Sequence, residues 1–266
     1  MSPPHIIDAH VHLEPNSRFY TPRPGLMDLL PLMDRLGIQY AVCTDHLSLY
    51  AGAGKGLDRL RKIFELSRGR IYYLGVYDPR KPSECLKAIK EALNWPGFAG
   101  IKIHPSFHGV AAEAPTYRAV WELAAEHSLA VLTHSWSVSP YNTAQKYSTP
   151  ERFERYIDEF KNVRLILAHA GGRGTGRNEA LRLLNTYENV YTDISGDIYC
   201  RRLIESLVRF ASPDKILFGS DFPWLDPRSN LARVFLAEVP DDAKEKILRN
   251  NALKVYRMEE SGKQFP

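Results

Sequence analysis

Short apolar runs alternate with longer segments of helical periodicity along the whole chain, and this alternation most constrains how it can fold. Eight runs have the length and composition of buried strands, and each is followed by a segment whose apolar residues recur every three or four positions. Eight strand–helix pairs are the number that closes a parallel (β/α)8 barrel. The expected strands are Ile6–Ala9, Tyr40–Thr44, Ile71–Val76, Ala99–Ile103, Ala130–Thr133, Leu165–Ala168, Val190–Thr192 and Ile216–Phe218.

The length agrees with one such barrel. The chain has 266 residues, and (β/α)8 barrels typically have about 250. No change in composition and no linker divides the sequence, so we predict a single α/β domain over residues 1–266: a TIM barrel with an additional C-terminal helix near 241–256. An open doubly wound sheet is the alternative architecture. The other expected helices lie near residues 26–36, 56–68, 83–93, 116–127, 150–160, 177–186, 200–210 and 229–237.

Charge and cysteine content exclude several classes of function. Lys and Arg total 35 against 31 acidic residues, and the basic residues are scattered along the chain, which argues against a nucleic-acid or membrane partner. Cys43, Cys85 and Cys200 form no CxxC pair, so we interpret them as reduced thiols. No apolar run approaches the roughly 20 residues that span a bilayer. We therefore expect a soluble, cytoplasmic protein that acts on a small molecule.

Polar residues with metal-binding side chains stand where the apolar strands stop. His10 and His12 follow the first strand two positions apart, and because side chains in a strand alternate between faces, both point the same way. The carboxyl ends of the strands form the face where barrel enzymes assemble their sites. The later strand ends carry Lys102, His104, His134, His169 and Asp221.

These residue types suit one divalent metal ion. Three neutral imidazoles and a carboxylate are typical ligands of Zn²⁺ or another borderline ion, and they leave one position for a water molecule. An aspartate beside that water can both bind the metal and accept a proton. The remaining histidines, His5, His46, His108 and His127, are expected to lie outside the site.

Five motifs in order along almost the whole chain resemble the amidohydrolase superfamily, and most closely its family 2 branch, which contains aromatic-acid decarboxylases as well as hydrolases. The resemblance implies a distorted (β/α)8 barrel with a metal at the carboxyl face of its strands. The motifs are Ile6–His12 (IIDAHVH), Gly100–Pro105 (GIKIHP), Leu132–His134 (LTH), Leu167–Gly172 (LAHAGG) and Phe218–Trp224 (FGSDFPW).

The same resemblance implies roles for individual residues. His10, His12, His134 and Asp221 would bind the metal, and Asp221 would also serve as a general base. His169 would either support the metal ligands from outside the coordination sphere or act as a catalytic residue. We expect a single ion, Zn²⁺ or Mn²⁺. A binuclear centre bridged by a carboxylated Lys102 is the alternative, because some superfamily members have that arrangement.

An unmodified Lys102 has other roles open to it. It could contact a substrate carboxylate or pair with Asp8 or Asp193. His104 could contact substrate or make a structural hydrogen bond.

Several loops after the strands carry residues that could shape a substrate pocket. We predict substrate contacts from Trp136 and Arg173, and the first loop offers Arg18 with two aromatic neighbours, Phe19 and Tyr20. The glycine-rich stretch 171–177 matches neither the dinucleotide-binding nor the P-loop pattern, so a nucleotide is not expected.

The motifs leave two reactions open. Our first hypothesis is a metal-dependent hydrolase acting on a carboxylate-bearing lactone, amide or ester, and the alternative is a non-oxidative decarboxylase of an aromatic or unsaturated carboxylic acid. A barrel kept only as a scaffold is disfavoured, because the set of metal-binding residues is complete. Proteins of this branch are often dimers, so the resemblance also makes a homodimer an expectation.

Overall fold

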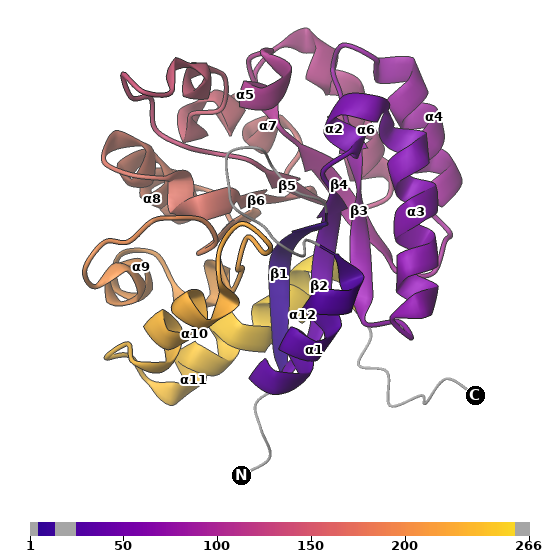
Figure 1. Ribbon diagram of the computed structural model, residues 1–266. Coiled ribbons are helices and arrows are strands. Elements are labelled where there is room, and N and C mark those ends of the chain that lie inside the picture. The colour runs from indigo at the N-terminus through magenta and orange to yellow at the C-terminus, as the bar shows by residue number, and fades with distance from the viewer. Residues whose placement is uncertain (1–4, 14–24, 259–266) are drawn as a thin grey trace.

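Eight parallel strands form one sheet in which each strand pairs with the next along the chain (Figure 1). The computed structural model describes residues 5–13 and 25–258. Every neighbouring pair is parallel, which confirms the predicted TIM barrel. The strands are β1 Ile6–Leu13, β2 Ile38–Asp45, β3 Ile71–Tyr77, β4 Phe98–Ile103, β5 Ala130–Thr133, β6 Arg164–Leu167, β7 Val190–Asp193 and β8 Ile216–Leu217.

The barrel is closed between its first and last strands by residues beyond the short β8. Ala9 donates its backbone N–H to the carbonyl of Phe218 at 2.9 Å, and Asp221 donates its own to the carbonyl of His10 at 2.9 Å. A parallel bridge joins Val11 to Phe222. The chain that follows β8 therefore runs beside β1 and carries Asp221 next to the histidines of that strand.

Helices connect the strands and surround the barrel, as Figure 1 shows. The predicted C-terminal helix is present, but it is divided into α11 and α12 by a π-helical turn at Lys246–Asn250. Two short helices, α2 and α5, follow β2 and β4 and were not predicted. The α-helices are α1 Leu26–Leu36, α2 Ser48–Ala51, α3 Ala53–Leu66, α4 Pro82–Ala92, α5 Pro105–His108, α6 Arg118–Glu126, α7 Glu154–Glu159, α8 Thr175–Thr186, α9 Leu203–Phe210, α10 Pro227–Phe235, α11 Asp241–Glu245 and α12 Asn251–Tyr256.

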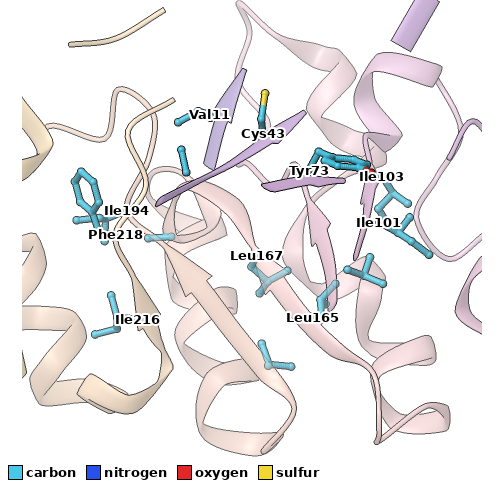
Figure 2. Packing of buried hydrophobic residues seen from close by; sticks show 14 of the residues in the cluster. Val11, Cys43, Tyr73, Ile101, Ile103, Leu165, Leu167, Ile194, Ile216 and Phe218 are labelled. Carbon is cyan, nitrogen blue, oxygen red and sulfur yellow. The ribbon is translucent and has the colours of Figure 1, made fainter. Parts of the chain in front are cut away.

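Alternation along the strands divides the buried residues into two layers. Outward-facing residues such as Ile101 and Leu165 pack against the surrounding helices (Figure 2). Inward-facing residues such as Leu132 and Ile166 fill the barrel, together with residues of α12. Tyr256 of α12 donates its hydroxyl hydrogen to the carbonyl of Ala9 at 3.1 Å. This helix therefore packs against the apolar interior of the barrel.

A β-bulge in β1 brings His10 to the inside of the barrel. Asp8 pairs with Ala41 and Val11 pairs with Cys43, so three residue steps on β1 oppose only two on β2. Ile7 and Ala9 belong to the interior layer, whereas Val11 belongs to the outer one, and the alternation therefore changes phase between Ala9 and Val11. Bulges of this kind redirect side chains next to active sites.

Among the described residues, no helix is both long enough and apolar enough to cross a membrane.

Candidate metal centre

Three side chains from the two ends of the sheet meet inside the barrel mouth. The Nε2 atoms of His10 and His12 lie 3.1 Å apart. Asp221 Oδ1 lies 3.1 Å from His12 Nε2 and 3.8 Å from His10 Nε2. The three residues are buried, and their ligand atoms lie within 4.8 Å of one another, so they could hold a metal ion.

The protonation of this cluster favours a cation. Burial and the nearby charge of Lys102 lower the pKa of His10 to about 3, and the same two causes hold the pKa of His12 well below its ordinary value. Both imidazoles are therefore neutral at pH 7, and each has a lone pair. Asp221 Oδ1 is buried and accepts no hydrogen bond within the described part of the chain. Two neutral imidazoles and a carboxylate suit Zn²⁺ or a similar ion.

Lys102 lies at the same centre. It points inward from β4, is almost completely buried, and its Nζ lies 3.0 Å from His10 Nε2. Burial lowers the pKa of Lys102 to about 8, while Asp193 and Asp221 act in the opposite direction. Neither Asp8 nor Asp193 is within hydrogen-bond distance of Nζ in the described structure; the direct partner of the lysine is a histidine.

His134 and His169 form a second pair beside the first. His169 Nε2 lies 3.2 Å from His134 Nδ1, and the rings of His169 and His10 stack with centroids 5.3 Å apart. His134 Nε2 in turn lies 2.9 Å from Gln145 Oε1. The structure thus places His134 against His169 and outside the cluster of His10, His12 and Asp221, so its role as a metal ligand remains a prediction.

The turn after β6 aims His169 at this centre. His169 and Ala170 both have left-handed backbone conformations, with φ of 61° and 48°. Such conformations are uncommon for residues other than glycine and occur often at functional sites. The backbone N–H of His169 is held by Asp193 Oδ1 at 3.0 Å.

The predicted substrate-binding residues lie at different depths. His104 stacks on His134 with centroids 4.3 Å apart, and its Nδ1 accepts a hydrogen bond from the Phe107 N–H at the start of α5. Trp136 contacts the rings of His134 and His169. Arg173 is exposed and forms an ion pair with Asp197. Trp136 is thus near the centre and Arg173 at the surface, while Arg18, Phe19 and Tyr20 lie outside the described residues.

An aromatic wall lies on the other side of His12. The indole of Trp224 stacks on the His12 ring, and the ring of His46 packs edge-on against that indole at 5.0 Å. Phe107 lies 6.2 Å from the His46 ring. His46 was expected to lie outside the site, but its ring is 6.4 Å from that of His12. Its position directly after β2, like that of the other strand-end residues, is the sequence signal that could have placed it here.

Asp193, the last residue of β7, and Ser195, just after the strand, are further residues of the centre. Asp193 Oδ2 lies 2.9 Å from His10 Nδ1. Burial alone would raise the pKa of Asp193, but the hydrogen bonds from His10 and Ser195 help to lower it below its ordinary value. Asp193 is therefore ionised and holds the imidazole of His10 in place. In the sequence analysis, Asp193 lies just after the seventh expected strand and is interpreted only as a possible partner of Lys102.

Comparison with known proteins agrees with this architecture. A family model described as Amidohydrolase matches residues 7–258. The chain belongs to this amidohydrolase family. The family match confirms the resemblance and supports an enzyme, and no curated protein matches the sequence.

Three solved decarboxylases have the same fold. The chain is similar to 2,6-dihydroxybenzoate decarboxylase from Rhizobium, with a TM-score of 0.75, 15% identity and coverage of 95% of this chain and 98% of that one. It is also similar to 5-carboxyvanillate decarboxylase from Sphingomonas paucimobilis, with a TM-score of 0.69, 13% identity and coverage of 96% and 99%. The third is dihydroxybenzoic acid decarboxylase from Polaromonas, with bound manganese and 2-nitroresorcinol, a TM-score of 0.72, 13% identity and coverage of 95% and 97%.

Proposed function

We propose that this amidohydrolase-family protein is a metal-dependent, non-oxidative decarboxylase of a small aromatic or unsaturated carboxylic acid. The observation that carries the proposal is the ammonium group of the buried Lys102, in a centre that the aromatic ring of Trp224 borders. A planar anion complements both features. The three structurally similar decarboxylases support this reaction over the hydrolysis that we first favoured.

His10, His12 and Asp221 would hold the metal, with His134 as the predicted fourth ligand. A bound divalent ion would supply a Lewis acid that attracts and polarises substrate oxygen atoms. Zn²⁺ and Mn²⁺ are the ions that we propose for this set of ligands.

The protein residues would supply charge and a proton. The buried ammonium of Lys102 favours an anionic substrate, because charges interact strongly in a medium of low dielectric constant. His169 Nε2 faces the centre and would take up a proton from solvent and transfer it to the substrate carbon. The bond between that carbon and the carboxylate then breaks, its electron pair stays on the carbon, and CO₂ leaves. A carboxylate and one proton thus give CO₂ and a product with one new C–H bond.

The test is an assay of purified full-length protein supplied with Zn²⁺ or Mn²⁺. A panel of hydroxylated benzoates and unsaturated carboxylic acids is monitored for CO₂ release, and a panel of lactones, amides and esters for acid release. We expect CO₂ from at least one acid, and incorporation of one deuteron at the vacated carbon when the reaction is run in D₂O. Acid release from the second panel without CO₂ from the first would reverse the assignment in favour of a hydrolase.

A further inference from the structure

The segment Asp193-Ile194-Ser195-Gly196, which follows the core of β7, contacts both histidine pairs of the centre. Its first and third residues are completely buried. Asp193 contacts His10, and Ser195 contacts both His10 and His169. The proposed function assigns this segment no role.

Asp193 is surrounded by hydrogen-bond donors whose direction is fixed. Its Oδ1 accepts the backbone N–H groups of His169 and Ser195, both at 3.0 Å, and also the Ser195 hydroxyl at 2.5 Å. Backbone N–H groups can only donate, so Oδ1 is an acceptor. Among the described residues, the other oxygen, Oδ2, has one partner, which is Nδ1 of His10 at 2.9 Å. A carboxylate in this position requires a proton on that nitrogen.

Ser195 likewise requires a proton on Nδ1 of His169. The hydroxyl group has one hydrogen, which it donates to Asp193 Oδ1. Its oxygen also lies 2.9 Å from the Nδ1 atoms of both His10 and His169. With its hydrogen already used, the oxygen can only accept from these two ring nitrogens, so His169 must also carry a proton on Nδ1.

Gly196 makes this contact sterically feasible. A Cβ atom at position 196 would lie 2.5 Å from His169 Nδ1, and the residue has a φ of +80°. On the far side, a Cβ at Gly219 would lie 3.0 Å from the Cβ of His10 and 3.1 Å from that of Ser195. Glycines thus stand where the segment approaches each of the two histidines.

We propose that Asp193 and Ser195 are positioning residues that fix the tautomers of His10 and His169, so that each ring carries its proton on Nδ1 and directs an unprotonated Nε2 into the centre. An aspartate orients the imidazole of the serine protease triad by the same principle. This inference rests on the proposed metal centre only for its purpose; the tautomers follow from the hydrogen bonds of an ionised Asp193.

His134 has its unprotonated ring nitrogen on the side of His169. Its Nε2 faces the carbonyl oxygen of Gln145, which is an acceptor, so His134 also carries its proton away from the pair. The unprotonated Nε2 of His169 and Nδ1 of His134 then face each other at 3.2 Å. Two lone pairs at this distance repel unless a cation or a proton lies between them, so these atoms form the part of the centre that receives one.

The test measures the tautomers directly in the metal-free full-length protein at neutral pH. Long-range ¹H–¹⁵N spectra of protein labelled at histidine distinguish protonated from unprotonated ring nitrogens, and His10→Gln and His169→Gln variants assign the two spin systems. We expect both rings to be protonated at Nδ1. An unprotonated Nδ1 on either ring in the wild-type protein would overturn the proposal without any need for a folded variant.

Two variants then test whether Asp193 and Ser195 fix the histidine tautomers or only fill space beside the rings. In Asp193→Asn, the amide oxygen must remain at the Oδ1 position to accept the two backbone N–H groups, so the amide NH₂ faces His10 Nδ1 and donates to it. We expect His10 to change to the Nε2–H tautomer and the Zn²⁺ affinity to fall about 10- to 100-fold, the range seen when an orienting partner of a metal ligand is lost. An unchanged His10 tautomer in this variant would overturn the role of Asp193.

In Ser195→Ala, His169 loses its acceptor, so we expect a mixture of His169 tautomers while His10 keeps its bond to Asp193. Thr192→Val is the matched control, because Thr192 is also a buried hydroxyl residue at the end of β7 but bonds to the carbonyl of Leu167. It should leave both tautomers and the Zn²⁺ affinity unchanged. Retention of a single His169 tautomer in Ser195→Ala would overturn the role of Ser195.

The outcome is distinguishable from that of the proposed function. The tautomers are measured without metal or substrate, and the affinity is measured with Zn²⁺ alone. A protein that shows the expected tautomers but releases no CO₂ contradicts only the decarboxylase assignment. A protein that releases CO₂ but carries the opposite tautomers contradicts only the role of Asp193 and Ser195.

Discussion

The imidazole of His12 lies nearly parallel to the indole of Trp224, with ring centroids 4.1 Å apart and an angle of 16° between the planes. The aromatic ring limits the orientations that His12 can adopt before a metal binds. A contact of this type contributes about 0.5–1.5 kcal/mol. Trp224→Ala should therefore weaken Zn²⁺ binding by roughly 2- to 10-fold, whereas Trp224→Phe, which keeps a stacking ring, should remain close to the wild-type protein. A competition assay with a chromophoric chelator measures both, and equal affinities for the two variants would contradict the role of the stack.

Asp221→Asn should remove metal binding without unfolding the protein. The backbone N–H of Asp221, which bonds to the His10 carbonyl and helps to close the barrel, is unchanged by the substitution. We expect the Zn²⁺ affinity to fall more than about 100-fold, which exceeds the loss typical of a group that only orients a ligand, and the CO₂ release to disappear. Asp226→Asn is the control, because this exposed residue caps α10 and asparagine caps helices equally well. Full metal content in Asp221→Asn would exclude Asp221 as a ligand.

Lys102 provides the test of one metal against two. With an unmodified lysine 3.0 Å from His10 Nε2, we expect about one equivalent of Zn²⁺ per chain, both with and without added bicarbonate. Lys102→Met should keep that equivalent and bind it more tightly, because a nearby positive charge is removed. Elemental analysis checks both proteins. Two equivalents in the wild-type protein with bicarbonate, falling to one in Lys102→Met, would establish the carboxylated, binuclear alternative.

His108 should make the protein less stable in acid. Burial lowers the pKa of His108 to about 4, with Asp78 opposing and Arg80 adding to this shift. Between the ordinary histidine pKa of 6.5 and about 4, the unfolded chain takes up a proton that the folded protein does not, so stability falls as the pH decreases through this range. The contribution of this residue between pH 7 and pH 5 is about 2 kcal/mol.

Urea denaturation at pH 7 and pH 5 measures this effect. His108→Gln should lose less stability between the two pH values than the wild-type protein does, because glutamine does not titrate. His127→Gln, at an exposed position, is the control and should behave like the wild-type protein. An equal acid sensitivity in His108→Gln and the wild-type protein would contradict the prediction.

The sequence predicted the barrel because each strand carries a local apolar signal. It ended the first strand at Ala9, whereas β1 continues to Leu13, because the polar residues His10 and His12 interrupt the apolar run even though the backbone ladder does not stop. The bulge that turns His10 inward depends on pairing with β2, which a single strand does not reveal. Most residues of the centre could be predicted in the same way, because they directly follow the apolar runs that mark the strands.

The remaining residues of the centre depend on contacts between distant parts of the chain. Asp193 bonds to His10 across 183 positions, and nothing local distinguishes this aspartate from one that ends a strand for structural reasons. Gln145 and His134 are only 11 positions apart, but they are brought together by a loop whose conformation carries no periodic signal. The sequence could not identify the partner of Lys102 either, because the choice between an acid and a histidine depends on how three distant strands, β1, β4 and β7, pack inside the barrel.

Gly196 allows the contact between the β7 segment and His169 to be tested separately from backbone strain. Gly196 and Gly109 have similar backbone angles, with φ of +80° and +68°, but a Cβ at 196 would meet His169 Nδ1, whereas one at 109 has nothing within 4 Å. An L-residue in this conformation costs about 1–2 kcal/mol, so Gly109→Ala should lose about that much in urea denaturation and Gly196→Ala at least as much. Only Gly196→Ala should also change the ¹⁵N ring signals of His169 and reduce CO₂ release, because its methyl group displaces that ring from Ser195. If Gly109→Ala changed the His169 signals equally, the effect would be due to strain in the fold and not to this contact.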